Sequence, residues 1–337
     1  MLPEEVLRRG TEVDHRELAS LRQWFPVSLD QDPVAVWWRF VGARRFTDPF
    51  FEDSLMAQPP QERQACRTPL SVLEHPLDNI PPTAFIFHVS RCGSTLLTQM
   101  LVALPQCIVM SEPPVLDAFF RLHHHQPDQS GGVQTFRGLV AALGQRRSLE
   151  ERCFFVKFDS WHMPWMPFVR EAFPDTPIVL LYREPEQVLA SHKRQRGAQM
   201  VPGLMDTSRL RPDIGGMASG DLDAYAGKLL DAIFDEALQA LPVAQPQLLN
   251  YSHLPAALWE DLSPRWRLDF SSGELQKLKR RAGFHSKHAE AAFAGDPKTP
   301  FAGPEKEMGR RSPAAHVYAQ LEAARISCAT GRCLPSQ

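Results

Sequence analysis

The sequence of 337 residues predicts an α/β fold in which helices cover both faces of a central parallel sheet. The first observation is a set of short, continuously apolar segments, such as residues 85–89 and 178–182, which are typical of strands buried on both faces. The second is the alternation of these segments with longer ones of helical periodicity. The third is a turn rich in small and hydroxyl residues that joins the first apolar segment to a helix.

Five strands are predicted in chain order, at 85–89, 107–110, 153–158, 178–182 and 247–251. The intervening segments predict helices at 94–104, 114–123, 133–147, 163–173 and 221–241, and another that begins at Glu184 and Pro185. Ser271 and Glu274 form a capping box that predicts a last helix, to about Arg281. The segment 197–220 is rich in Gly, Pro, Met and Ser, which predicts a loop that could be mobile and could cover the site.

Residues 1–80 are interrupted repeatedly by proline and predict an irregular extension with short helices around 13–23 and 33–43. The chain is therefore expected to consist of this extension, at 1–80, packed on a main α/β domain at 81–337. The pair Trp37 and Trp38 is interpreted as an anchor of the extension to the core.

The composition excludes several classes of protein. Charged residues make up 23% and hydrophobic residues 43%, as in globular chains, and a net charge of -2 gives no basic excess for nucleic acid. No apolar run is long enough to span a membrane, and the start of the chain lacks the apolar region of a secretory signal. The 6 cysteines are widely spaced, which favours reduced thiols and a cytoplasmic location over a disulfide framework.

The turn Ser90-Arg91-Cys92-Gly93-Ser94-Thr95 is typical of a phosphate cradle. The first N–H groups of a helix have no intrahelical partner, and the helix dipole adds partial positive charge there. An anion at that point gains hydrogen bonds and charge complementarity together.

The turn lacks the parts that nucleoside triphosphatases need. Their signature places Gly-Lys directly before a Ser or Thr, whereas Gly93 is followed directly by Ser94 and Thr95. No acidic residue for Mg²⁺ is evident, since the third strand ends in Lys157-Phe158-Asp159, and no Gly-x-Gly-x-x-Gly is present. The fold is therefore P-loop-like without the metal and triphosphate parts.

The turn resembles the 5′-phosphosulfate loop of the sulfotransferases that use 3′-phosphoadenosine 5′-phosphosulfate (PAPS), most of all the variant in tyrosylprotein and bacterial enzymes, which carries Arg where cytosolic enzymes carry Lys. A second motif agrees with the first. Arg183 at a strand end, with Ser191 eight residues further on, resembles the 3′-phosphate site of that family. An Arg fork and a helix hydroxyl suit a phosphate monoester. The resemblance covers 84–192 and implies a P-loop NTPase-like three-layer sandwich.

The resemblance also implies catalytic residues. Glu112 matches the catalytic base of tyrosylprotein sulfotransferases, which takes the proton of the acceptor. Lys157 matches a lysine that would neutralise charge on the leaving phosphate oxygen, and Arg91 would hold the sulfuryl oxygens. The alternatives are a surface acid for Glu112 and a lysine paired with Asp159 for Lys157.

Further contacts to the cofactor are implied for the backbone and hydroxyls of Ser90, Cys92, Gly93, Ser94 and Thr95, and for Tyr251 and Ser286. Tyr251 would alternatively be a buried tyrosine with a satisfied hydroxyl. The run His123-His124-His125 is interpreted as a polar turn rather than a metal site, and His162 either borders the acceptor pocket or belongs to the core.

The sequence thus predicts an enzyme that transfers a sulfuryl group from PAPS to a hydroxyl or amine of a small-molecule acceptor, without a metal. A nucleotide-dependent kinase or other phosphotransferase and a non-catalytic nucleotide-binding protein are the alternatives. The acceptor would be selected by the N-terminal extension, the loop at 197–220 and the C-terminal region.

Overall fold

The computed structural model describes residues 4–75, 78–215, 220–284 and 312–329. Its centre is a five-stranded sheet in which every strand pair is parallel, in the order β6-β7-β5-β8-β9. The strands are β5 (Ala84–His88), β6 (Cys107–Ser111), β7 (Cys153–Lys157), β8 (Ile178–Tyr182) and β9 (Gln247–Asn250). The first four are buried along their whole length, which confirms the predicted parallel sheet.

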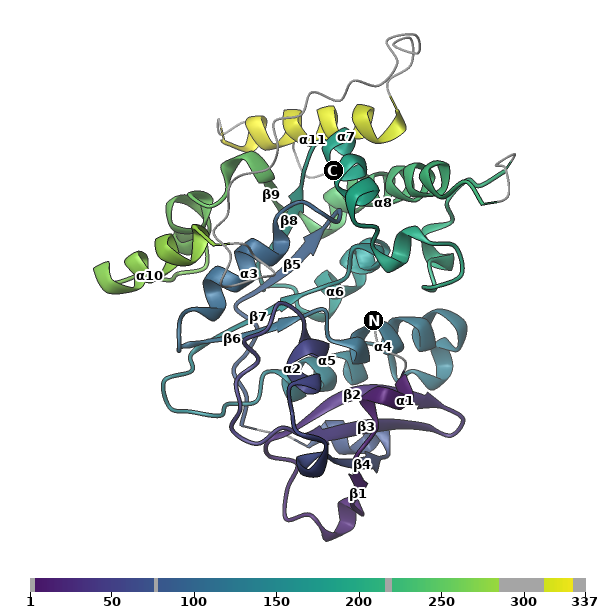
Figure 1. Cartoon of the computed structure of the whole chain (residues 1–337), viewed down its shortest axis with the longest axis vertical. Coiled ribbons are helices and arrows are strands. Elements are labelled where there is room, and N and C mark those ends of the chain that lie inside the picture. Colours follow the sequence, from purple (N-terminus) through teal and green to yellow (C-terminus); the bar gives the residue numbers. More distant parts are fainter. Residues whose placement is uncertain (1–3, 76–77, 216–219, 285–311, 330–337) are drawn as a thin grey trace.

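Helices cover both faces of this sheet (Figure 1). They are α3 (Ser94–Val102), α4 (Pro114–His125), α5 (Gly132–Leu143), α6 (Met166–Ala172), α7 (Pro185–Arg194) and α8 (Leu222–Ala244). The connection from β5 to β6 through α3 runs across the sheet in one direction, and the connections to β7, β8 and β9 run in the other. Because such crossovers are right-handed, α3 lies on one face of the sheet and the later helices lie on the other. The result is the predicted three-layer arrangement.

The central strand β5 is the point at which the direction of strand addition reverses. The chain goes from β5 outward to β6, returns through β7, and then continues past β5 to β8 and β9. In open α/β sheets ligands bind beyond the carboxyl ends of the strands at such a switch point. The turn after β5, at residues 89–93, lies there.

The N-terminal region was predicted wrongly as irregular and helical. It forms a second sheet, in the order β1-β4-β3-β2, from β1 (Thr11–Glu12), β2 (Trp24–Gln31), β3 (Val34–Phe40) and β4 (Gln64–Thr68). The helix expected at 33–43 is strand β3, whose β-branched and aromatic residues favour a pleated surface. Only a 3₁₀ turn, His15–Glu17, lies in the helix expected at 13–23.

Proline misled the prediction because two of the prolines lie where a sheet tolerates them. Asp32 and Pro33 form the two-residue turn between the antiparallel strands β2 and β3. Pro26 lies at a register shift in β2, and bulges accommodate proline. The short helices α1 (Glu4–Leu7) and α2 (Phe51–Met56) flank the strands.

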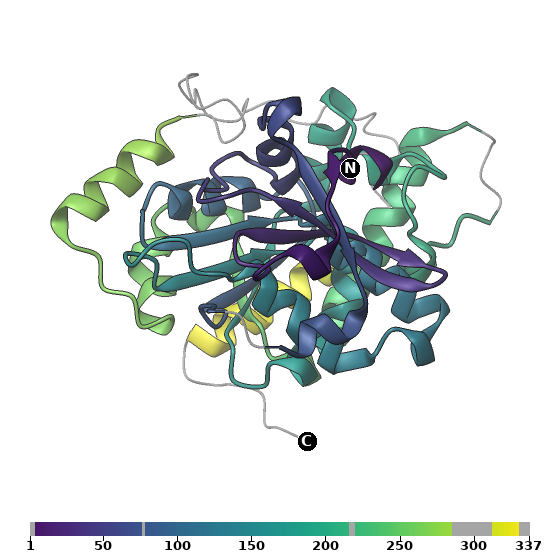
Figure 2. The ribbon, with the colours of Figure 1, turned by 90° about the horizontal axis from the view of Figure 1, so that it is seen from below.

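The two sheets share one hydrophobic core. Strand β2 packs against α4 and α5 of the main domain. Trp38 is fully buried and donates to Thr68 of β4, and its role as an anchor to the main domain stays a prediction. Seen from below in Figure 2, the N-terminal strands lie across the central sheet and its helices. The N-terminal region therefore borders the main domain closely enough to contribute to a site.

The C-terminal part contains α9 (Ser263–Arg265), α10 (Ser272–Ala282) and α11 (Pro313–Ala329). The capping box of Ser271 and Glu274 is confirmed at the start of α10. Helix α11 was not predicted, and it packs against α7, α8 and β9. Among the described residues, no helix is both long and apolar enough to cross a membrane.

Candidate active site

The turn between β5 and α3 has the backbone of an anion-binding loop. Ser90, Arg91 and Gly93 all have positive φ, at 73°, 47° and 86°. Such left-handed conformations are rare for residues with a Cβ and concentrate at functional sites. Backbone of this kind occurs in anion-binding turns, and the loop leads directly into the N-terminus of α3, where Ser94 and Thr95 are buried. Binding of an anion by the loop stays a prediction.

Gly93 is required at its position for two reasons. Its φ lies in the left-handed region, and a Cβ there would lie 2.7 Å from Cδ2 of Tyr251. The close approach places the Tyr251 ring directly against the loop. Tyr251 follows β9, so the segments that follow the strands β5 and β9 meet at this point.

The Ser90 hydroxyl is oriented by two donors. The amide of Gln199 donates to its Oγ at 3.1 Å, and Nε2 of His192 lies 3.1 Å from the same atom. Because Nδ1 of His192 accepts the N–H of Gly197, the proton of a neutral His192 is on Nε2 and points to Ser90. The hydroxyl proton of Ser90 then remains available to an anion in the loop.

Arg183 lies beside the loop, at the end of β8. Its guanidinium is 4.2 Å from the centroid of the Tyr251 ring, its Nε donates to Gln187, and its NH1 donates to the Arg91 carbonyl at 3.4 Å. Arg183 is 9% exposed. A buried guanidinium held flat against an aromatic ring is preorganised for a phosphate.

The remaining residues that were predicted to bind the co-substrate have side chains that contact other parts of the chain or lie further along α7. The Cys92 thiol donates to the Leu181 carbonyl inside the core, and burial raises its pKa to about 12, so only the backbone of Cys92 faces the loop. The Arg91 guanidinium donates to the Gln195 carbonyl at 2.5 Å, just beyond α7. Ser191 lies half-buried on the last turns of α7, and its role stays a prediction.

Glu112 and Lys157 meet at the carboxyl ends of the neighbouring strands β6 and β7. Lys157 Nζ lies 2.9 Å from Glu112 Oε1, and the Glu112 N–H donates to the Lys157 carbonyl at 2.8 Å. The lysine is fully buried, while the glutamate side chain is 20% exposed. Glu112 also has a positive φ, of 56°, which turns it out of the line of β6.

His88 connects this pair to the loop. The Ser90 N–H donates to His88 Nδ1 at 3.0 Å, so the proton of the neutral imidazole is on Nε2, which lies 3.4 Å from Glu112 Oε1. Burial lowers the pKa of His88 below its usual value, which keeps the ring neutral at pH 7. One imidazole thus separates the anion loop from the carboxylate.

The charges of the cluster set the ionisation of Glu112. Burial alone would raise the pKa of this carboxyl, but the Lys157 ammonium and the His88 N–H together hold it well below its usual range. Glu112 is therefore ionised at neutral pH. Burial raises the pKa of the neighbouring Asp159 well above its usual value, and the Glu112 and Asp117 carboxylates raise it further.

Four further residues contact the predicted ones. The sequence indicated His88 only as a satisfied histidine near the loop, and it did not indicate His192, Gln199 or Phe50, whose ring centroid lies 4.8 Å from Lys157 Nζ. The position of His88 at the carboxyl end of β5, two residues before Ser90, was the available signal. Phe50 comes from the N-terminal region and had no such signal.

Ser286, predicted to contact the cofactor, lies outside the described residues. Within the described ranges, no group of three His, Cys, Asp or Glu residues could hold a metal ion. His123, His124 and His125 end helix α4, where His123 contacts Ser130 and His125 pairs with Asp206.

Comparison with solved structures gives several matches, and two of them are described here. Sulfotransferase STF1 from Mycobacterium tuberculosis H37Rv matches 60% of this chain and 72% of its own, with 16% identity and a TM-score of 0.36. The sulfotransferase domain of the Synechococcus PCC 7002 olefin synthase matches 74% of this chain and 90% of its own, with 17% identity and a TM-score of 0.37.

No protein-family model matches the sequence, and neither does any curated protein. Both of the structures named above are sulfotransferases, the family that the motifs at Ser90–Thr95 and Arg183 resemble.

Proposed function

We propose that this protein is a PAPS-dependent sulfotransferase that transfers a sulfuryl group to an acceptor hydroxyl. The observation that carries the proposal is the meeting of Glu112 and Lys157, 45 residues apart in sequence, at 2.9 Å and one imidazole away from an anion loop. A base and a cation beside an anion site are what in-line transfer to a hydroxyl requires.

The bound co-substrate would extend from the loop to Arg183. The N–H groups of the loop, with the hydroxyls of Ser90, Ser94 and Thr95, would hold the 5′-phosphosulfate. Arg183, stacked on Tyr251, would bind the 3′-phosphate together with Ser191. Recognition of a 3′-phosphate distinguishes PAPS from ATP, and no residue of this set requires a metal.

In the proposed reaction the acceptor oxygen forms a bond to sulfur as the bond from sulfur to the 5′-phosphate oxygen breaks. Glu112 takes the hydroxyl proton, and adenosine 3′,5′-bisphosphate leaves with the bonding electrons. Lys157 balances the negative charge that develops on the leaving oxygen, and Arg91 balances that on the sulfuryl oxygens.

The ion pair between Glu112 and Lys157 has a consequence for the base. A carboxylate whose pKa is held low by an ammonium at 2.9 Å is a weak base. When Lys157 turns to the leaving oxygen it withdraws from Glu112, and the basicity of the carboxylate rises. The pair would therefore keep the base weak until the co-substrate is in place.

The first test is ligand-dependent thermal stability. We expect adenosine 3′,5′-bisphosphate to raise the melting temperature without Mg²⁺, since a ligand that binds only the native state at 100 times its Kd stabilises it by about 2.7 kcal/mol. ADP should have little effect. Arg183→Ala should abolish the shift, and Arg265→Ala, which removes an exposed arginine of α9, serves as the control.

Transfer itself is then measured with labelled PAPS and a panel of hydroxyl acceptors. A melting shift with ADP that depends on Mg²⁺ would instead support a phosphotransferase. Binding of the bisphosphate without any PAPS consumption would support a non-catalytic nucleotide-binding protein.

A further inference from the structure

The C-terminal helix α11 lies beside the ends of the two strands that precede Arg183 and Tyr251. It packs against β9, α7 and α8 (Figure 1). Tyr182 ends β8 and Asn250 ends β9, and these two residues are paired in register. Arg183 and Tyr251 are the next residues along the chain after this pair. Helix α11 is therefore close enough to influence the residues that are proposed to bind the 3′-phosphate.

One carboxylate of α11 joins the ends of both strands. Oε1 of Glu322 accepts hydrogen bonds from the Tyr182 hydroxyl and from Nδ2 of Asn250, the latter at 3.1 Å. Nε and NH2 of Arg325 donate to the two oxygens of the same carboxylate, at 3.0 Å and 2.9 Å. Burial would raise the pKa of Glu322, but the hydrogen bonds from these three residues lower it to about 2, so the carboxylate is ionised at neutral pH.

The amide of Asn250 extends this contact to the turn that carries Tyr251. Its Nδ2 also donates to the Tyr318 hydroxyl of α11 at 2.9 Å. Its Oδ1 accepts the N–H and the hydroxyl of Ser252, both at 2.9 Å, and so caps the 3₁₀ turn Tyr251–His253. Because both ends of this buried amide are engaged, its orientation fixes the start of the turn relative to α11.

The position of the Tyr251 ring in turn determines where the Arg183 guanidinium lies. The guanidinium is 4.2 Å from the centroid of that ring, and the other side of the contact is closed by the anion loop at Gly93. A binding group has to be held within about 0.5 Å of its productive position by the residues that pack around it. A displaced ring would therefore displace the cation that the 3′-phosphate is proposed to meet.

We propose that Glu322 is a positioning residue for the 3′-phosphate site. By accepting hydrogen bonds from Tyr182 and Asn250, it would hold the ends of β8 and β9 so that Tyr251 supports Arg183 in one orientation. It would act through these residues and not by touching the phosphate, which a carboxylate repels. This inference rests on the proposed function, because it names a residue that sets the affinity of that same site for 3′-phosphorylated nucleotides.

The test compares the binding of adenosine 3′,5′-bisphosphate and adenosine 5′-phosphate to the full chain by calorimetric titration. The ratio of the two dissociation constants reports the contribution of the 3′-phosphate, since the two nucleotides are otherwise identical. We expect Glu322→Ala to reduce the preference for the bisphosphate by about 3- to 10-fold, because Arg183 is retained but is held less firmly. The affinity for the 5′-phosphate should change by less than about 2-fold.

Two further variants separate positioning from a general loss of structure. Glu322→Gln keeps an acceptor oxygen for Tyr182 and Asn250, so it should retain the preference to within about 2-fold. In the Arg183→Gln background, Glu322→Ala should not reduce the preference any further, because the cation that it positions is gone. The same reduction in both backgrounds would show that Glu322 acts independently of Arg183 and would overturn the inference.

The control is Asp231→Ala, which removes a contact at the opposite end of α11. Asp231 of α8 accepts the N–H of Ala314, in the first turn of α11, at 2.9 Å. The preference should be unchanged in this variant, even where its melting temperature falls. An equal reduction in Asp231→Ala and Glu322→Ala would reject a specific role for Glu322.

A milder variant is available in case Glu322→Ala does not fold. Tyr318→Phe removes only the hydroxyl that accepts from Asn250, and it should reduce the preference by roughly 2- to 3-fold. If the preference were unchanged in Tyr318→Phe and in every folded Glu322 variant, the inference would be overturned.

The outcomes also separate this inference from the proposed function. A wild-type preference for the bisphosphate that no change in α11 affects would reject the positioning role and leave the sulfotransferase in place. A preference that depends on Glu322, without any transfer from PAPS to an acceptor, would keep the positioning role and reject the sulfotransferase. Equal affinity of the wild-type chain for the two nucleotides would reject both.

Discussion

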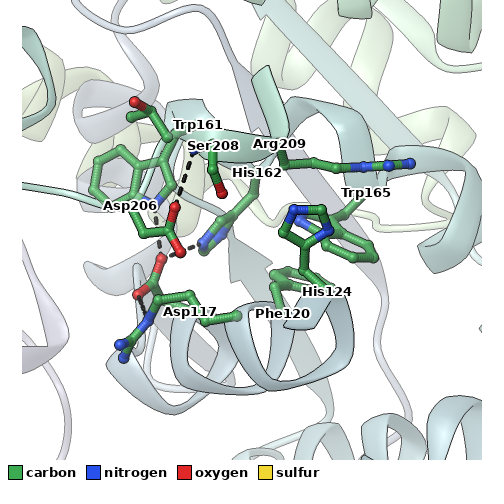
Figure 3. A pocket seen from close by; sticks show the side chains of 11 residues that line it. Asp117, Phe120, His124, Trp161, His162, Trp165, Asp206, Ser208 and Arg209 are labelled. Carbon is green, nitrogen blue, oxygen red and sulfur yellow. Dashed lines mark hydrogen bonds and ion pairs between the residues drawn. The ribbon is translucent and has the colours of Figure 1, made fainter. Parts of the chain in front are cut away.

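The carboxyl edge of the central sheet and the aromatic cluster around His162 differ in how they handle charge (Figure 3). At the edge, the fully buried Lys157 ammonium and the His88 imidazole lie 2.9 Å and 3.4 Å from the Glu112 carboxylate. In the aromatic cluster, His162 Nε2 lies 3.0 Å from Asp117 Oδ1, so its polar atom is paired within the core. The edge is suited to moving protons and charge, and the aromatic cluster to packing. Changes at the edge should therefore lower kcat, and changes in the cluster should lower the stability of the fold.

The largest effect is expected from Glu112→Gln. The amide keeps the volume of the side chain but cannot accept the acceptor proton, and general base catalysis contributes roughly 10²–10⁴-fold. We expect kcat to fall by that factor while the melting shift with adenosine 3′,5′-bisphosphate is retained. Glu274→Gln, at the capping box of α10, is the matched control. Unchanged kcat would reject Glu112 as the base.

The next largest effect is expected at the residue that would bind the 3′-phosphate of the co-substrate. Arg183→Gln keeps the buried volume approximately but removes the charge that would pair with the 3′-phosphate. We expect affinity for adenosine 3′,5′-bisphosphate to fall about 10- to 100-fold, while affinity for adenosine 5′-phosphate changes little. An equal loss of affinity for both nucleotides would show that Arg183 does not bind the 3′-phosphate.

A smaller effect is expected at the contact between the two sheets of the molecule. Phe50→Leu removes the ring that lies 4.8 Å from Lys157 Nζ but retains an apolar side chain. A partly desolvated cation–π contact is worth about 1–2 kcal/mol, so we expect kcat to fall by roughly 5- to 30-fold with KM nearly unchanged. Phe40→Leu in strand β3 is the control, and a comparable loss there would reject a specific role for Phe50.

The smallest effect is a change in pH dependence. The pKa of His88 is lowered in the folded protein by burial, so below about pH 6.5 the unfolded chain binds a proton there that the native state does not. Stability must then fall as the pH is lowered from 7.5 to 5.5. We expect His88→Gln to reduce that fall by about 1 kcal/mol in denaturant titrations at the two pH values. His253→Gln, at an exposed residue, should leave the fall unchanged.

The elements of the main domain could be predicted because each strand–turn–helix unit is encoded locally. The apolar run before Ser90 and the hydroxyls after Gly93 specify a strand, a turn and a helix within the 19 residues 84–102. The N-terminal sheet could not be predicted from the same signals. Its prolines lie at a hairpin turn and at a bulge, but in the sequence alone a proline indicates the end of a strand or helix. Pairing between β3 and β4, far apart in sequence, decides that region.

The sequence by itself determined which residue types lie at the carboxyl edge of the sheet, since parallel strands all end there. It placed Glu112 after one strand and Lys157 at the end of another. Only the tertiary structure decided that these strands are neighbours, with Ser111 opposite Lys157, so that the two charges pair. It also decided that Phe50 covers the lysine and that Trp165 and Arg209 share a pocket. Each of these contacts joins segments that are far apart in the sequence, and no pattern in the sequence indicates that they are neighbours. Only the packing of the folded chain brings them together.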